Sequence, residues 1–105
     1  MAGSDVFPYS QVDELFQVVV GNTPVALTLP TNTFRHVMIQ VSDQPVRWRA
    51  DGVNPNGAMG IKQPVDSTID WMNPHIDYRG LVTKLRFVRD TTATGNATLE
   101  VAFFT

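Results

Sequence analysis

Apolar and polar residues alternate in short runs along most of this chain, and residues that favour turns close each run. Val37, Ile39 and Val41 occupy every second position of one run, and the same period of two continues from 97 to 104. Successive side chains of a β-strand point to opposite faces, so this period predicts strands with one buried face. The alternation therefore favours an antiparallel β protein.

We expect about seven to eight antiparallel strands in a single β-sandwich that is jelly-roll-like. Turn residues such as Gly21-Asn22 and Asp51-Gly52 separate the runs. The last two strands alternate most clearly and are expected to form a hairpin that turns through residues 90–96. The predicted strands cover residues 16–20, 25–29, 34–41, 46–50, 64–72, 84–88 and 97–104.

The length of 105 residues suits one domain. We expect residues 1–13 to form an extended N-terminal arm and residues 14–105 to form the sandwich. The arm is mixed and polar, with isolated Val6, Phe7 and Tyr9. Such a segment frays in a monomer, so we expect it to reach a neighbouring subunit. These three residues, with Phe104 at the C-terminal edge, are the predicted interface residues.

The charge content favours a subunit of an assembly. Charged residues make up 17% of the chain, below the roughly 25% of ordinary soluble domains. We therefore expect a homo-oligomer, with a trimer as the predicted state; the alternative is a compact monomer with a surface rich in Thr, Asn and Gln. Eight Lys and Arg face ten Asp and Glu, without the basic excess of nucleic-acid binders. No apolar stretch approaches the roughly 20 residues of a membrane span, and the first residues lack a signal-peptide pattern, so no membrane partner is expected.

Patterns for catalysis and metal binding are weak. His75 and Asp77 would share one face of an extended segment, as a base and its orienting partner or two metal ligands would. The nearest further carboxylates, Asp66 and Asp70, have no recognised ligand spacing. The chain has no cysteine, no G-x-S-x-G serine and no phosphate-binding loop. We expect no enzyme activity, no metal and no cofactor, and interpret His75 as a loop histidine bonded to local backbone.

The segment Arg47-Trp48-Arg49 combines basic and aromatic residues, as some nucleic-acid binding faces do. In a strand, however, Trp48 points to the side opposite both arginines, so the three cannot line one groove. We expect Trp48 in the core and both arginines on a solvated outer face, paired with acids of the next strand. Met59 and Met72 are further apolar residues that the strand pattern leaves outside the core.

Residues 45–60 contain a distinctive block: Pro45-Val46-Arg47-Trp48-Arg49, then Asp51-Gly52, Pro55 and Gly60. Two strands follow it, Leu85-Arg86-Phe87-Val88-Arg89 and the run from Ala97 to Phe104. In this order the segments resemble small virion proteins of tailed phages and prophages, over roughly residues 15–105. The chain departs from that group at Ile61-Lys62-Gln63-Pro64 and in a longer segment from 66 to 78.

The resemblance implies a β-sandwich that is a structural component of a phage particle, assembled in the cytoplasm of a bacterial host. We expect a non-enzymatic capsid decoration, or cement, protein that stabilises the head shell. Its partners would be the major capsid protein or other virion proteins, and copies of itself. A neck, tail or fibre-base component is the alternative in the same class. A host-surface carbohydrate-binding module is another, with exposed Trp71 and Tyr78 near Asp70 and Asp77 as its platform.

Overall fold

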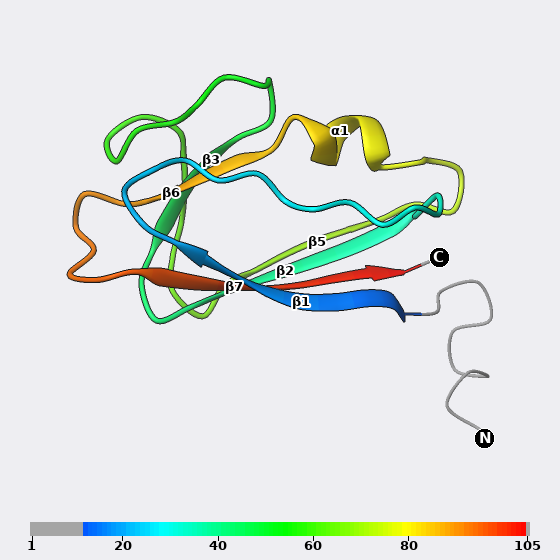
Figure 1. The fold of residues 1–105 in the computed structure, drawn as a ribbon, viewed down its shortest axis with the longest axis horizontal. Helices are drawn as coiled ribbons and strands as arrows, with labels where there is room; N and C mark the ends of the chain where they lie inside the picture. Colours follow the sequence, from blue (N-terminus) through cyan, green and yellow to red (C-terminus); the bar gives the residue numbers. More distant parts are fainter. Residues whose placement is uncertain (1–11, 105) are drawn as a thin grey trace.

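The computed structural model describes residues 12–104, which fold into two antiparallel sheets packed face to face (Figure 1). The first sheet, sheet A, has the strand order β1-β7-β2-β5, and the second, sheet B, has the order β4-β3-β6. The elements are β1 Val12–Val20, β2 His36–Ser42, β3 Val46–Arg49, β4 Ile61–Gln63, β5 Thr68–Met72, α1 Arg79–Thr83, β6 Arg86–Arg89 and β7 Ala97–Phe104. The prediction of an all-β sandwich is confirmed, and β1 begins at Val12.

The strand pairing is that of a long hairpin rolled into two sheets. Val25 lies beside β6 and exchanges two backbone hydrogen bonds with Phe87, of 2.8 and 2.9 Å. When this segment is counted as the second of eight strands, the first pairs with the eighth, the second with the seventh, the third with the sixth and the fourth with the fifth. This nesting of pairs gives the jelly roll its topology.

The segment 25–29 was predicted as a strand, and this prediction is wrong, because only Val25 forms a ladder bridge. Pro24 and Pro30 flank the segment, and neither has an N–H group to donate. Leu27 is nevertheless buried in the core. The alternation thus predicted which side chains of this segment point inward, although its backbone forms strand-type hydrogen bonds at a single residue.

The predicted hairpin of the last two strands is also wrong, because β6 and β7 belong to different sheets. β7 lies inside sheet A between β1 and β2, whereas β6 lies in sheet B beside β3. Residues 90–96 cross from one sheet to the other, anchored by Asp90 N–H, which donates to the Pro45 carbonyl at 3.0 Å. A period of two fixes which face is buried but not which strand is the partner.

The core lies between the sheets and is made by the predicted inward-facing residues. Val37, Ile39 and Val41 of β2 are fully buried, as are the alternate residues of β7 that end at Phe103. The ring of Phe103 packs against that of Phe34, with centroids 4.5 Å apart. Complete burial of each such side chain stabilises the fold by about 1.5–3 kcal/mol, so the cysteine-free chain is held together by apolar packing.

Aromatic side chains close the open side of the sandwich between β5 and β3. The Trp48 ring meets Trp71 edge-on at 5.8 Å, and Trp71 stacks on Tyr78 at 6.4 Å. Trp48 Nε1 donates to Gln63 Oε1 at 3.2 Å, which ties β3 to the short edge strand β4. Trp48 thus packs on the core, as its face in the strand predicted.

Candidate interaction surface

The outer face of sheet A holds the one predicted interface residue that lies in the described part of the chain. Phe104, near the end of β7, points away from the core and is half-buried, and its ring stacks on the His36 imidazole at 4.3 Å. The other three predicted interface residues, Val6, Phe7 and Tyr9, lie outside the described residues.

His36 is buried on this outer face and pairs with a neighbouring strand. Its Nε2 lies 2.7 Å from Asp70 Oδ1 of β5. A carboxylate only accepts hydrogen bonds, so Nε2 donates its N–H to Asp70. Within residues 12–104 the other ring nitrogen, Nδ1, has no hydrogen-bond partner. A buried polar nitrogen without a partner is therefore left on the same face as Phe104.

Large apolar side chains are exposed on the same face along the edge strand β1. Leu15 is 70% exposed and Val19 is 62% exposed, and both point outward with Gln17 between them. At the opposite edge, Met72 of β5 is also exposed, as its place outside the predicted core suggested. Apolar side chains grouped on an open sheet face are typical of protein contact surfaces.

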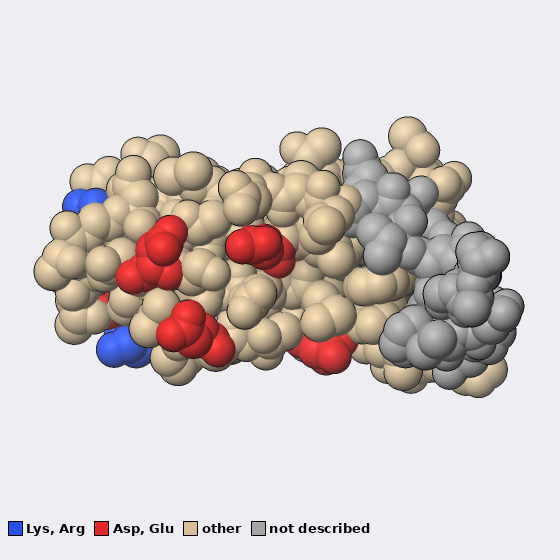
Figure 2. Space-filling model, turned by 90° about the horizontal axis from the view of Figure 1, so that it is seen from below, with Lys and Arg blue, Asp and Glu red and all other residues tan. Residues whose placement is uncertain are grey.

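The two sheets differ sharply in charge. Within residues 12–104, the four strands of sheet A contain no Lys or Arg, whereas the three strands of sheet B contain five. Figure 2 views the molecule from the side on which β1 and β7 lie in Figure 1, and acidic side chains are spread over this face, with Lys and Arg near one end only. The outer face of sheet A therefore combines apolar and acidic groups.

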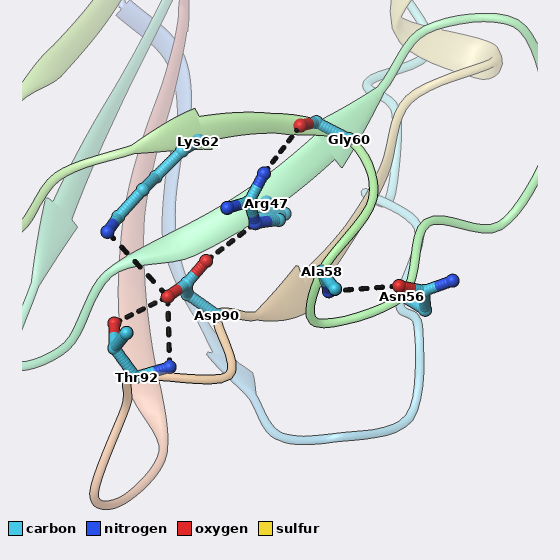
Figure 3. Close-up of polar contacts among 7 residues, drawn as sticks. All are labelled: Arg47, Asn56, Ala58, Gly60, Lys62, Asp90 and Thr92. Carbon is cyan, nitrogen blue, oxygen red and sulfur yellow. Dashed lines mark hydrogen bonds and ion pairs between the residues drawn. The ribbon is translucent and has the colours of Figure 1, made fainter.

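Sheet B carries a buried charge cluster centred on Asp90, which follows β6 and is only 1% exposed (Figure 3). Arg47 Nε donates to Asp90 Oδ1 at 2.6 Å, and Lys62 Nζ lies 3.8 Å from Oδ2. The Thr92 N–H and hydroxyl both donate to Oδ2. These hydrogen bonds from Thr92 and the nearby cations hold the pKa of Asp90 far below its ordinary value. The carboxylate is thus ionised and fully bonded, which suits a structural tie better than a reactive group.

We predicted that Arg47 and Arg49 lie on a solvated face and pair with acids of the next strand. Each arginine meets only part of this prediction. Arg47 binds Asp90 just after the neighbouring strand β6, but this pair is largely buried. Arg49 instead binds Asp51, two residues further along its own chain, at 2.5 Å. Nothing in the alternation indicated that the loop after β3 would fold back over one arginine and leave the other outside.

The loop that follows β3 explains why the distinctive block of residues 45–60 has its composition. Gly60 has a φ of +133°, which side chains disfavour, and its carbonyl accepts a hydrogen bond of 3.0 Å from Arg47 Nη1. A Cβ at Gly60 would lie 3.2 Å from that of Pro55, which is buried. Asn56 Oδ1 accepts the Ala58 N–H at 2.9 Å and tightens the same loop. The residues of this block therefore stabilise the loop that covers sheet B.

A hollow at the edge of sheet B was not predicted from the sequence. It has a volume of about 450 Å³ and is lined by Trp48, Arg49, Met59, Gly60 and Ile61 among others. Met59, which the strand pattern had left outside the core, and Ile61 are both exposed there. The hollow depends on β4, whose three residues are too few to show a period.

His75 and Asp77 both take part in local hydrogen bonds before and at the start of α1. Asp77 Oδ1 accepts the Arg79 N–H at 3.0 Å at the start of α1, and His75 N–H donates to Asn73 Oδ1 at 2.9 Å. In residues 12–104 there is no group of three or more His, Asp or Glu side chains that could hold a metal ion. Over the same range, no helix is both long enough and apolar enough to cross a membrane.

The aromatic platform expected for carbohydrate binding was predicted on exposed side chains. Trp71 and Tyr78 are both half-buried and pack against the core. Asp70 points to the opposite face of β5 and pairs with His36 there. The expected exposure of these rings is therefore wrong.

Comparison of the chain with known protein families, curated protein sequences and solved structures finds no match.

Proposed function

We propose that this chain is a non-enzymatic structural subunit that acts by being packed against other proteins through the outer face of sheet A. The observation that carries this proposal is the exposed apolar pair Leu15 and Val19 on a sheet face without Lys or Arg. Burial of exposed apolar area drives most protein association. The buried Nδ1 of His36 on the same face has no hydrogen-bond partner within residues 12–104, and a polar group of a partner protein can supply one.

Within this class, the chain is proposed to be a bacteriophage virion protein, and specifically a decoration or cement protein of the head shell. The resemblance of residues 45–60, 85–89 and 97–104 to small phage virion proteins supports this assignment. The roles of Arg47 and Gly60 agree with it, since the shared block serves the fold and not a reaction. A chain that stabilises a shell needs a packed core and an open face, and both are features of this chain.

The test is binding of the purified chain to heads of a phage whose genome encodes it, prepared without the protein. The wild-type chain is expected to bind the shell surface and raise its resistance to heat, with its position seen by electron microscopy of whole particles. Val19→Lys should weaken binding at least about tenfold, because it places a charge in an apolar contact. Val53→Lys, at an exposed apolar site outside the strands, is the matched control and should bind normally.

Density only at the neck or tail would overturn head decoration in favour of the alternative virion position. Failure to bind any part of the particle would overturn the virion assignment altogether. Binding that Val19→Lys leaves unchanged would show that the contact does not use the outer face of sheet A.

A further inference from the structure

β1 presents the longest open strand edge in the described part of the molecule. It has nine residues and lies at the end of sheet A, where it pairs only with β7. The strand at the other end of that sheet, β5, has five residues. In sheet B, β4 has three residues, and the bridge at Val25 covers one side of β6. An open edge of nine residues offers a row of unpaired N–H and C=O groups to another strand.

From Leu15 to Val20, β1 has no feature of the kind that usually prevents edge pairing. Its sequence contains no Lys and no Pro, which are the residues most used to block an edge. Its one irregularity in register lies at its start, between Val12 and Glu14. From Leu15 to Val20 it pairs with β7 without interruption. This part of the strand is therefore regular enough to accept a further strand.

The hydrophobic pattern of β1 is symmetric about Gln17. Leu15 and Phe16 precede Gln17, and Val18 and Val19 follow it. Leu15 and Val19 are exposed on the outer face, and Phe16 and Val18 reach the core but stay only partly buried. A contact between identical copies across a two-fold axis requires a self-complementary surface of this kind.

We infer that β1 pairs antiparallel with β1 of a second copy, across a two-fold axis at Gln17. In this register Leu15 lies opposite Val19 of the second copy on the outer face, and Phe16 lies opposite Val18 on the inner face. Every exposed or half-exposed apolar residue between Leu15 and Val19 then meets an apolar partner. The two copies of sheet A join into one sheet of eight strands.

Charge favours the antiparallel direction. The acidic residues of β1, Asp13 and Glu14, both lie at its N-terminal end. Antiparallel pairing places positions 13 and 14 opposite positions 21 and 20 of the second copy, whereas parallel pairing would bring four acidic residues together. Like charges directly opposite each other destabilise a strand pair. The inference deepens the proposed function by naming one partner as a second copy, and it gives a two-fold dimer in place of the expected trimer.

The absence of cysteine allows the register to be tested by single cysteine variants. Gln17→Cys should form a disulfide-linked dimer, because residues opposite each other in an antiparallel pair have Cα atoms about 4.5–5.5 Å apart. Leu15→Cys and Val19→Cys should not cross-link alone, because each lies four residues from its own copy, roughly 13 Å away, beyond the ~7 Å limit. An equimolar mixture of these two variants should cross-link. Gln40→Cys, exposed on β2 of the same sheet, measures random collisions.

We expect Gln17→Cys to cross-link at least about tenfold faster than Gln40→Cys, because pairing raises the effective thiol concentration. Light scattering of the wild-type chain should give twice the mass of 11.7 kDa, and Val19→Lys should return it to the single mass. A monomer at high concentration, or Leu15→Cys cross-linking alone as fast as Gln17→Cys, would overturn the inference. A monomer that still binds phage heads overturns this pairing alone, whereas a dimer that binds no particle overturns only the proposed function.

Discussion

The two sheets of this sandwich are held in place by different interactions. Sheet A has strands of five to nine residues with alternating burial, and its strands contain no Lys or Arg. Sheet B has strands of three or four residues, and its outer side is tied by the Arg47–Asp90 cluster under a folded-back loop. The interactions that stabilise the fold therefore leave the outer face of sheet A open, whereas they occupy the outer side of sheet B.

The largest expected effect comes from opening the core beneath sheet A. Phe103→Ala should lower the free energy of unfolding by about 3–5 kcal/mol, because the ring is fully buried and its removal leaves a cavity. Urea unfolding followed by circular dichroism measures this loss. Phe104→Ala, at the next residue but on the outer face, should cost clearly less. Equal losses would contradict the assignment of the two faces.

The next effect comes from breaking the charge cluster of sheet B. Arg47→Met should destabilise the fold by about 3 kcal/mol, since it leaves the buried Asp90 carboxylate without its closest cation. Arg49→Met removes the same charge two residues away, where the partner Asp51 is exposed, and should change stability little. Similar midpoints for the two variants in urea would show that the cluster does not hold sheet B.

The charge on Asp90 should also make sheet B sensitive to acid. Its pKa is lowered in the folded state, so its stabilising effect is complete above the ordinary carboxyl pKa of 3.8 and is lost as pH falls below it. Asp90→Asn should be less stable than wild type by about 2 kcal/mol at pH 7. This difference should shrink below pH 3.8, as measured by urea midpoints across a pH series. A difference that grows in acid would contradict the lowered pKa.

The smallest effect on stability is expected on the outer face of sheet A. Val19→Thr keeps a β-branched side chain at an exposed site and should change the free energy of unfolding by less than about 0.5 kcal/mol. The same change should weaken self-association seen by light scattering, because it places a hydroxyl in the apolar pair. A loss of folding stability without a loss of association would show that Val19 contributes to the fold and not to the contact between copies.

The alternation of residues was enough to predict the faces of sheet A but not the path of the chain. Val37, Ile39 and Val41 were placed on one buried face correctly, because burial repeats every second residue in long strands. The partner of β7 was predicted wrongly, since the same pattern suits any neighbour. β4 and α1 were not predicted, because three residues and one helical turn are too short to show a period.

The candidate surface was only partly accessible to sequence reasoning. Phe104 was predicted as an outward-facing contact residue, and the structure does place it on the outer face of sheet A. The pairing of His36 with Asp70 joins residues 34 positions apart, so no local pattern could indicate it. Asp90 was interpreted as a turn residue, because its burial depends on a loop that returns from β3. Both omissions involve contacts that only the tertiary fold creates.

The position of β7 between β1 and β2 sets the order in which the chain can fold. β1 is synthesised first among the described strands and β7 last, yet β7 is the only strand with which β1 pairs. During translation, β1 therefore remains unpaired until β7 has been made, and Leu15, Val18 and Val19 are accessible to other chains. Contacts between distant parts of a sequence also form slowly. Folding of sheet A is thus expected to be completed only once β7 has been synthesised, in competition with aggregation through the same edge.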